Sequence, residues 1–330
     1  MHGQFGSIAN GTLQQTDGYT LRLSVTDRCN LRCRYCMPAD GVPGVQHLDL
    51  LSLEDLADAV RLLCSALPIA RIKLTGGEPL VRVGLPSLIR QLRAITGINE
   101  ISLTTNGTLL ARLGEELKNS GLARVNISLD SLDPATFAEV TRGGQLKETL
   151  EGIRVAQEIG LTPVKLNAVL RQSTWKRDIP LLFDFAVEHR LEVRLIELMR
   201  TGTEQAWCER EYVSASDVEN ELLSSAIPIP VLHASPGPAR VSLVRWRGEE
   251  LRVGWITPRS RPFCSRCNRL RMDSRGRIFR CLMDGHFLPF ADIVLAEGEE
   301  AALESLTEYL CGKFPPSTMH RTSSMASIGG

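Results

Sequence analysis

Several features that define other protein classes are missing from this chain of 330 residues. It has no run of about 18 apolar residues, so no membrane-spanning helix is predicted. The segment from Met1 to Thr20 is polar and contains glycine, and it lacks the apolar core of a signal peptide. The 38 Lys and Arg residues balance 38 Asp and Glu residues, so no overall field attracts nucleic acid or a membrane, and any basic site is local. We therefore expect a cytoplasmic protein with neither of these partners.

A P-loop and a complete four-cysteine motif are also missing. Because the chain has no G-x-x-x-x-G-K-[ST] loop, a triphosphate would have to be bound by dispersed Arg and Lys side chains. The nine cysteines are odd in number, and most of them form two groups of three, which indicates metal ligands rather than disulfides in a long intracellular chain. The remaining Cys64, Cys208 and Cys311 are predicted to be small buried or partly exposed side chains.

The first group of cysteines has the spacing C-x3-C-x2-C and directly follows a strand-like segment. Cys29, Cys33 and Cys36 lie on one tight loop and could hold three irons of a cubic [4Fe–4S] cluster. Ferredoxin-type carriers usually fill all four positions, so an open iron favours chemistry at the cluster. Two alternatives stay open: a disulfide with one spare thiol, and a zinc site. Structural zinc needs four ligands, and the nearest histidine, His47, lies outside the loop.

The second group of cysteines has the spacing C-x2-C-x13-C and consists of Cys264, Cys267 and Cys281. Zinc ribbons begin with the same C-x2-C pair, and His286 could supply a fourth ligand. By itself, this spacing leaves zinc and an iron–sulfur cluster equally open.

Four arginines lie between the last two cysteines of this group. Arg269 and Arg271 are two positions apart, so their side chains point the same way if the segment is extended. Guanidinium groups bind phosphate oxygens in a bidentate manner, and we predict that this pair binds an anionic ligand. Arg275 and Arg277 are predicted to form a solvated basic surface.

From residue 19 to about residue 200, an apolar strand, a loop and an amphipathic helix recur, which predicts a parallel sheet with right-handed crossovers. Polar side chains interrupt the apolar strands, and burying them under two helix layers would be costly. We therefore predict an α/β fold, an incomplete (βα)6 TIM-type barrel with a cluster-bearing C-terminal extension, rather than a flat doubly wound sheet. The predicted strands are Leu21–Thr26, Arg71–Thr75, Glu100–Thr104, Arg124–Leu129, Val164–Leu170 and Val193–Met199.

Unusual residues follow the C-terminal ends of these strands, which share the active face of a parallel α/β barrel. They are the first cysteine loop, Gly76-Gly77-Glu78-Pro79, Thr104-Thr105-Asn106-Gly107, Ser128 with Asp130, and Met199. Each of these residues could simply form a turn. Because all of them follow the same ends of the strands, we predict that they form one site.

The chain is predicted to divide into four parts. Residues 1–18 are a flexible N-terminal segment, residues 19–200 form the partial barrel, residues 201–314 form a C-terminal domain with the second cysteine group, and residues 315–330 form a tail that ends in Gly-Gly. Within the C-terminal domain, short antiparallel strands are expected in residues 231–256, and one last helix over Ala291–Cys311.

The two cysteine groups, the Gly-Gly-Glu-Pro segment and the sequence Cys267-Asn268-Arg269-Leu270-Arg271 together resemble the radical S-adenosylmethionine (SAM) enzymes. Among these, residues 15–330 are similar to the family of GTP 3′,8-cyclases, which act early in molybdenum cofactor biosynthesis. The resemblance implies a lyase that converts GTP to (8S)-3′,8-cyclo-7,8-dihydroguanosine 5′-triphosphate. A radical derived from SAM would take the hydrogen from C3′, and C3′ would then attack C8 of the guanine.

The resemblance also implies roles for individual residues. Cys29, Cys33 and Cys36 would hold a first [4Fe–4S] cluster, and Cys264, Cys267 and Cys281 a second one that faces GTP. Gly329 and Gly330 would reach into the active site. Lys73 stands where the family pattern has arginine, so its contact keeps the charge but loses the bidentate fork. The implied SAM-binding residues are Tyr35, Gly77, Ser128 and Met199, and the implied GTP-binding residues are Arg22, Lys73, Thr104, Lys165, Arg269, Leu270 and Arg271.

The implied partners are GTP, a reducing electron donor such as a flavodoxin or ferredoxin, and the downstream synthase of the molybdopterin precursor, and the resemblance allows a homodimer. Two other functions fit parts of the pattern. One is a radical SAM enzyme that modifies a peptide or RNA with an auxiliary cluster, and the other is a non-catalytic zinc-binding module.

Overall fold

The computed structural model describes residues 18–41, 50–200, 204–223, 227–229, 239–264 and 267–311. Six strands alternate with helices along the first part of the chain, and neighbouring strands pair in parallel. This confirms the predicted (βα)6 pattern, with strand boundaries that shift by at most three residues. The strands are β1 (Tyr19–Ser24), β2 (Ile69–Thr75), β3 (Glu100–Thr105), β4 (Arg124–Ser128), β5 (Lys165–Val169) and β6 (Glu192–Ile196).

Two of the barrel's α-helices begin at a residue whose side chain caps them. Ser52 caps the first helix by accepting a hydrogen bond from the Asp55 N–H group at 3.0 Å, and Asp133 caps the fourth by accepting one from Thr136 N–H at 2.9 Å. The helices are α1 (Leu53–Ala66), the short η2 (Pro79–Val81), α2 (Leu85–Arg93), α3 (Leu110–Asn119), α4 (Pro134–Thr141), α5 (Leu146–Glu158), α6 (Trp175–Glu188), α7 (Gln205–Glu211), α8 (Ala215–Leu223), α9 (Phe290–Glu297) and α10 (Glu299–Cys311).

The C-terminal part of the chain extends both edges of the barrel sheet. Strand β10 (Arg269–Met272) pairs in parallel with β1, and β9 (Glu249–Ile256) pairs in parallel with β6. With β7 (Ile227–Ile229), β8 (Arg240–Trp246) and β11 (Ile278–Phe279), they form one sheet of 11 strands in the order β11-β10-β1-β2-β3-β4-β5-β6-β9-β8-β7. The sheet is therefore open rather than closed into a barrel.

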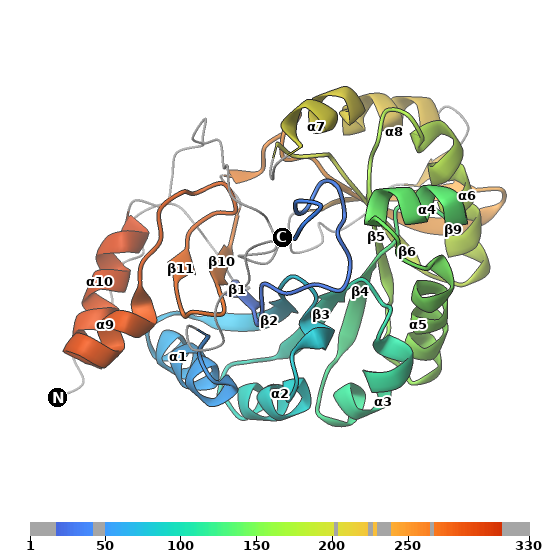
Figure 1. The fold of residues 1–330 in the computed structure, drawn as a ribbon. Coiled ribbons are helices and arrows are strands. Elements are labelled where there is room, and N and C mark those ends of the chain that lie inside the picture. Colours follow the sequence, from blue (N-terminus) through green and yellow to red (C-terminus); the bar gives the residue numbers. More distant parts are fainter. Residues whose placement is uncertain are drawn as a thin grey trace.

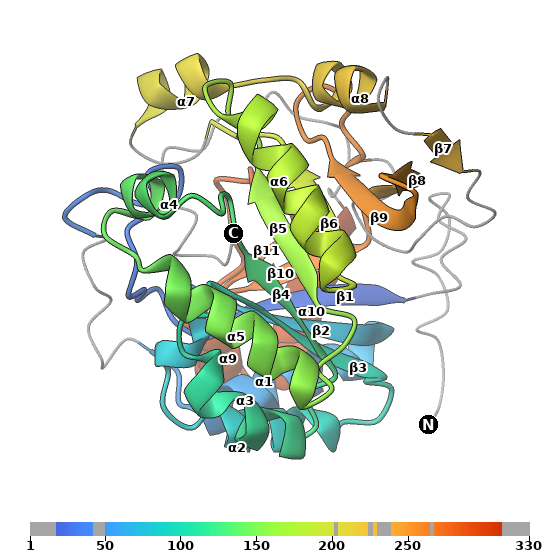
Figure 2. The same cartoon turned by 90° about the vertical axis from the view of Figure 1, so that its right-hand side faces the viewer.

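The two faces of this sheet differ in chemistry. Its convex face carries buried apolar side chains such as Ile72, Leu103 and Val193, which join the helices in one core. In Figure 1, helices α1, α2, α3, α5 and α6 surround this outer face, and Figure 2 shows α5 and α6 lying along it. The concave face carries the alternate, polar positions of the same strands.

Of two predictions for the C-terminal part of the chain, one is confirmed and one is wrong. The predicted antiparallel strands are confirmed as the hairpin of β8 and β9, whose turn places Arg247 and Gly248 at positive φ. The single helix predicted over Ala291–Cys311 is wrong. The chain forms α9 and α10 instead, because Gly298 adopts a φ of 95° and ends the first helix.

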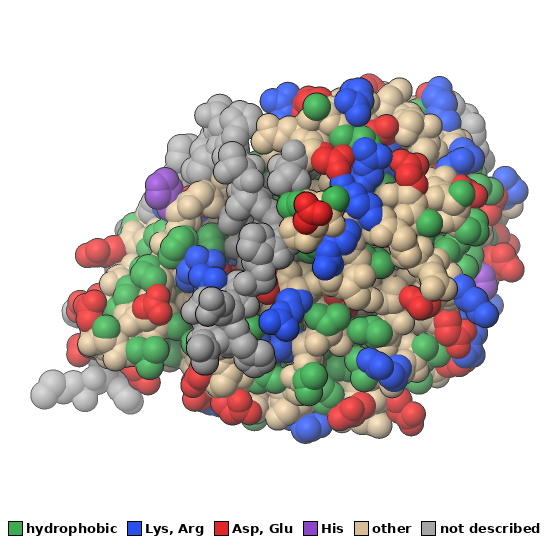
Figure 3. All heavy atoms as spheres, viewed as in Figure 1, with side chains coloured by type: hydrophobic (Ala, Val, Ile, Leu, Met, Phe, Trp, Pro, Cys, Tyr) green, Lys and Arg blue, Asp and Glu red, His purple; other side chains and the backbone are tan. Residues whose placement is uncertain are grey.

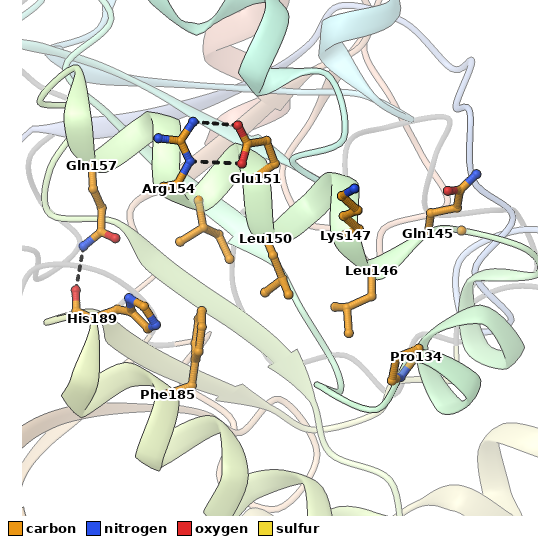
Figure 4. Close-up of a pocket in the computed structure, with 12 residues that line it drawn as sticks. Pro134, Gln145, Leu146, Lys147, Leu150, Glu151, Arg154, Gln157, Phe185 and His189 are labelled. Carbon is orange, nitrogen blue, oxygen red and sulfur yellow. Dashed lines mark hydrogen bonds and ion pairs between the residues drawn. The ribbon is translucent and has the colours of Figure 1, made fainter.

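A pocket of about 700 Å³ lies on the outside of the barrel, between α5 and α6. Figure 4 shows its apolar side chains, including Leu146, Leu150 and Phe185, with the Arg154–Glu151 ion pair at its rim. Among the residues that the structure describes, none of the predicted site residues lines it. Over the described ranges, no helix combines the length and apolar character needed to cross a bilayer.

Candidate active site

The first cysteine loop follows β1 and is wound tightly. The N–H groups of Cys36 and Met37 donate hydrogen bonds to the Cys33 carbonyl at 2.9 and 3.1 Å, and Leu31 N–H donates to the Cys29 sulfur at 3.4 Å. Burial raises the pKa of the Cys33 thiol well above its usual value, and the negative charges of Cys36, Asp130 and Cys29 raise it further. The three thiols therefore lie near one another in a partly desolvated position.

The Gly-Gly-Glu segment after β2 packs directly on the start of this loop. Gly77 N–H donates to the Thr26 carbonyl and Glu78 N–H to the Arg28 carbonyl, both at 2.8 Å. A Cβ atom on Gly77 would lie 2.3 Å from the Arg28 carbonyl oxygen, so only glycine fits. Gly77 thus has a packing reason for its identity, in addition to its predicted contact with SAM.

Glu78 ties the end of β2 to the end of β3. Its buried carboxylate accepts hydrogen bonds from the Thr105 hydroxyl and from Asn106 N–H, both at 2.7 Å. Burial raises its pKa to about 7, although these hydrogen bonds lower it. The Asn106 side chain in turn donates to Asn30 at 2.8 Å, so two strand ends and the cysteine loop form one network.

The opposite side of the loop is held by ion pairs. Arg142, which adopts a φ of 55° after α4, donates hydrogen bonds to the carbonyls of Arg32 and Met37 at 2.9 and 3.0 Å. Glu204, just before α7, pairs with both Arg142 and Arg34. In Figure 3, Lys and Arg side chains gather beside Asp and Glu between α4 and α7.

Six of the seven predicted GTP-binding residues lie on the concave face of the sheet. In the paired strands, Arg22 lies beside Arg271 on one side and Lys73 on the other, and Arg269 lies beside Thr20. Residues paired across parallel strands point to the same side. Thr104 and Lys165 continue this face, both paired with Asn126 of β4. Leu270 alternates with the two arginines, and its side chain is fully buried on the opposite face.

Positive charges crowd this face strongly enough to change their own ionisation. The pKa of Arg22 is lowered to about 9, first by burial and then by the charges of Arg269 and Arg194. The pKa values of Lys73 and Arg271 are also lowered, first by burial and then by neighbouring arginines. A ligand that carries several negative charges would best relieve the repulsion among the positive charges of this face.

Two cations of this face were not singled out from the sequence. Arg194 of β6 donates to the Asn126 side-chain oxygen at 3.3 Å, and burial lowers its pKa to about 10. Arg124 of β4 pairs with Glu100 at 2.6 Å. The sequence did carry a signal for both, because each stands at an alternate, inward-facing position of a predicted strand, where Arg124 pairs with Ser102 and Arg194 with Asn167.

The second group of cysteines lies next to these arginines. Burial raises the pKa of the Cys264 thiol, and the charges of Cys281 and Cys267 raise it further. The same two cysteines act on Arg271, where they oppose the lowering of its pKa. The three cysteines therefore lie near one another, with Arg271 close to Cys267 and Cys281. Cys281 is exposed, whereas Cys264 and Cys267 are half-buried.

The cysteines suit a cluster by their chemistry rather than by a compact arrangement. In the part of the chain that the structure describes, no three His, Cys, Asp or Glu side chains stand close enough to surround a single metal ion. Ligands of a cubic cluster each bind a different iron, so they lie farther apart than the four ligands of one zinc ion. Two sets of three thiols therefore fit two clusters.

Some predicted residues lie outside the described ranges, and others differ from what was predicted for them. Gly329 and Gly330 lie outside the described residues, as does His47. The imidazole of His286 is 86% exposed and lies 3.5 Å from Asp284. The prediction of a solvated surface is wrong for Arg277, which is half-buried and pairs with Asp273 at 2.6 Å.

Comparison with known proteins identifies the family. A model of the Radical SAM superfamily matches residues 23–179, and a model of Molybdenum Cofactor Synthesis C matches residues 191–314. The GTP 3′,8-cyclase of Moorella thermoacetica is 46% identical over 273 residues, which cover 82% of this chain and 83% of that protein. The enzyme of the same name from Alkaliphilus metalliredigens is 42% identical over 275 residues, or 83% and 84% of the two chains.

The chain belongs to the GTP 3′,8-cyclase family. Membership makes it a radical SAM enzyme and confirms the predicted cofactors, SAM and [4Fe–4S] clusters. Among solved structures, SuiB of Streptococcus suis bound to S-adenosylmethionine has a TM-score of 0.60 at 14% identity. The match covers 84% of this chain and 66% of SuiB. At that identity the likeness extends to the fold alone, which agrees with the open barrel of this cyclase-family chain.

Proposed function

We propose that this protein converts GTP to (8S)-3′,8-cyclo-7,8-dihydroguanosine 5′-triphosphate, an early step of molybdenum cofactor biosynthesis. The names of its relatives and the Molybdenum Cofactor Synthesis C match support this proposal. The observation that carries it is the cationic concave face, where Arg271, Arg22 and Lys73 lie side by side on three neighbouring strands. A triphosphate bears the multiple negative charge that this face favours.

At the cofactor end, Cys29, Cys33 and Cys36 would hold the first cluster, and its open iron would bind SAM. When bound, the reduced cluster and SAM supply the radical that removes a hydrogen atom from C3′ of GTP. The protein positions the reactants and excludes side reactions. Tyr35, Gly77, Ser128 and Met199, which follow or end strands on the same side of the barrel, would contact SAM.

At the substrate end, the cations would hold the triphosphate, and the second set of thiols would hold the cluster that faces the guanine. Arg22, Lys73, Lys165, Arg269 and Arg271 would contribute charge, and Thr104 a hydroxyl group. Since the Leu270 side chain is buried on the other face, only its backbone could contact GTP. The phosphates would raise the pKa of Lys73 again and keep it charged, although a single ammonium group lacks the bidentate fork of arginine.

The decisive assay incubates reduced, reconstituted protein with GTP and SAM. We expect 5′-deoxyadenosine to form together with the consumption of GTP. Formation of 5′-deoxyadenosine without GTP consumption would exclude GTP as the substrate. Iron and labile sulfide near roughly eight of each per chain are expected for two cubic clusters, whereas zinc without labile sulfide would contradict the cluster assignment.

The proposed function implies partners and a cellular location for this protein. A flavodoxin or ferredoxin would supply electrons, a molybdopterin-precursor synthase would use the product, and the protein would act in the cytoplasm, alone or as a homodimer. Gly329 and Gly330 would complete the active site. We retain residues 201–314 as the cluster-bearing C-terminal unit, although its strands join the sheet of the barrel.

A further inference from the structure

Asn126 lies in the middle of β4, at the centre of the concave face. Its neighbours in the paired strands are Thr104 of β3 and Lys165 of β5, and it is fully buried. An uncharged amide therefore stands among the cationic side chains of this face, and no role described so far explains it.

The amide of Asn126 makes hydrogen bonds in two directions. Its oxygen accepts from the guanidinium groups of Arg124 and Arg194, at 3.4 and 3.3 Å. Its nitrogen donates to the Leu103 carbonyl at 3.3 Å and to the Thr104 hydroxyl at 3.4 Å. Because Arg194 belongs to β6, its side chain reaches across β5 to meet this amide. One amide thus joins polar side chains of three different strands.

The chemistry of these partners allows one orientation of the amide. A guanidinium group can only donate hydrogen bonds, and a backbone carbonyl can only accept them. If the amide were turned over, its NH2 group would face the two guanidinium groups and its oxygen would face the Leu103 carbonyl. Asn126 therefore holds Arg124 and Arg194 in defined positions beside Thr104, which is a predicted GTP-binding residue.

The amide holds these arginines without cancelling their charge. A carboxylate gives arginine its strongest hydrogen bonds, and Glu100 pairs in this way with Arg124, at 2.6 Å. A carboxylate at position 126 would place a second negative charge beside the same guanidinium group and beside Arg194. Asparagine leaves that positive charge to a ligand, and the resulting attraction grows with the negative charge of the ligand.

We propose that Asn126 is a positioning residue of the triphosphate site and determines its preference among nucleotides. It fixes Arg124, Arg194 and Thr104 while it leaves the site its positive charge, so that a nucleoside triphosphate binds better than the corresponding diphosphate or monophosphate. The inference rests on the proposed function, because it takes GTP as the ligand of the concave face. Asn126 acts through its neighbours and takes part in no step of the reaction.

The Asn126→Asp variant tests the inference, because it changes the charge of the side chain and not its size. The two guanidinium groups favour the ionised form of the carboxylate. We expect the affinity for GTP to fall by about tenfold, that for GDP to fall less and that for GMP least. The ratio of the Kd for GMP to the Kd for GTP should therefore decrease. A general structural defect would weaken all three alike and keep this ratio.

The Asn126→Ala variant removes the hydrogen bonds and adds no charge. It should weaken GTP binding by roughly threefold, because the arginines are no longer held in place. Equilibrium dialysis of the reconstituted holoenzyme with each nucleotide measures these changes, and its iron content should stay as in the wild type. The matched control is Asn119→Asp, at an exposed asparagine that ends α3, which should keep both the affinity and the ratio.

The Glu100→Gln variant decides the question should Asn126→Asp fail to fold. It removes the carboxylate that pairs with Arg124 from a side chain that is 30% exposed, so the ratio should increase. Combined with Asn126→Asp, it should bring the ratio back towards that of the wild type, because the net charge is the same again. An unchanged ratio in Glu100→Gln or in Asn126→Asp would overturn the inference, as would wild-type GTP affinity in Asn126→Ala.

Failure of the proposed function would look different. If the wild-type protein does not bind GTP, or binds it without cyclising it, the substrate assignment fails before Asn126 is considered. If the wild type binds and cyclises GTP and the ratio is the same in every variant, only the role of Asn126 fails.

Discussion

The two cysteine groups lie in contrasting environments. The first is embedded in hydrogen bonds from the ends of β2, β3 and β4, and the thiol of Cys33 is strongly desolvated. The second lies beside Arg269, Arg271 and Arg22, and it includes the exposed Cys281. The charge of Arg269 contributes to the lowered pKa of both Arg22 and Arg271. One end of the site is thus organised by directional hydrogen bonds and the other by positive charge.

This contrast follows the chemistry that each end is proposed to perform. A radical reaction needs its source held at a defined distance from C3′, because small displacements of reacting atoms are costly. A triphosphate needs charge above all, and several cations can share it. We therefore expect substitutions at the first group to affect geometry and turnover, and those at the second to affect GTP affinity.

The largest expected effect is that of Cys33→Ser compared with Cys281→Ser. Cys33→Ser should abolish the cleavage of SAM, because the first cluster would be lost. Cys281→Ser should keep SAM cleavage measurable and abolish cyclisation of GTP. Each variant should retain roughly four of the expected eight irons, measured by iron analysis and by the formation of 5′-deoxyadenosine. Equal loss of SAM cleavage in both variants would remove the distinction between the two ends.

Arg271→Ala should weaken GTP binding by about 10- to 100-fold, because a charge-assisted contact is lost. SAM binding and iron content should stay as in the wild type. Equilibrium dialysis with both ligands measures this, and Arg61→Ala provides the control, since Arg61 is an exposed arginine of α1 that pairs with Asp58. Loss of iron from Arg271→Ala would make this arginine a structural support of the second group instead.

Lys73 should make GTP binding depend on pH. Burial and neighbouring arginines lower its pKa well below the usual value in the free protein, whereas bound phosphate would raise it. Binding therefore takes up a proton above the free pKa, and GTP affinity should fall as the pH rises through that region. Lys73→Arg, which keeps its charge, should give a flatter profile of Kd against pH. Parallel profiles for both proteins would mean that Lys73 does not meet the phosphates.

The last expected effect concerns Glu78, next to the first loop, and it changes stability rather than turnover or GTP affinity. Its folded-state pKa of about 7 exceeds the ordinary value of 4.5, so the folded protein binds this proton more tightly than the unfolded chain does. Stability is then greatest below pH 4.5 for this group and falls as the pH rises to 7, by about 3 kcal/mol. In Glu78→Gln, thermal unfolding measured across this pH range should no longer show this decrease in stability. If the stability of Glu78→Gln depended on pH in the same way as that of the wild type, Glu78 would have its ordinary pKa in the folded protein.

Much of this fold could be predicted from the sequence, because the patterns that mark its strands lie within short stretches of the chain. Strands β1 to β6 are apolar runs, and the first four are followed within three residues by Gly, Asn or Asp. Polar residues at alternate positions mark the concave face. Arg22, Lys73 and Lys165 could be placed on that face for this reason. Arg124 and Arg194 carried the same signal and were overlooked.

The rest depends on contacts between distant parts of the chain. Strand β10 has only four residues and pairs with a strand near the N-terminus, so its sequence alone does not mark it. The hydrogen bond between Tyr35 and Asp130 joins residues 95 positions apart. The break between α9 and α10 depends on one glycine conformation, which a helical pattern of apolar residues on both sides conceals.

The pairing of β1 with β10 also has a consequence for folding. The Asn268 side chain bonds to Gly18, 250 positions earlier in the chain. On a ribosome, the backbone of β1 on that side therefore has no sheet partner until most of the protein has been made. Contacts of such sequence separation form slowly, and an unpaired strand edge invites association with other chains. We expect chaperones to be most needed, and truncated chains most prone to aggregate, before residue 272 emerges.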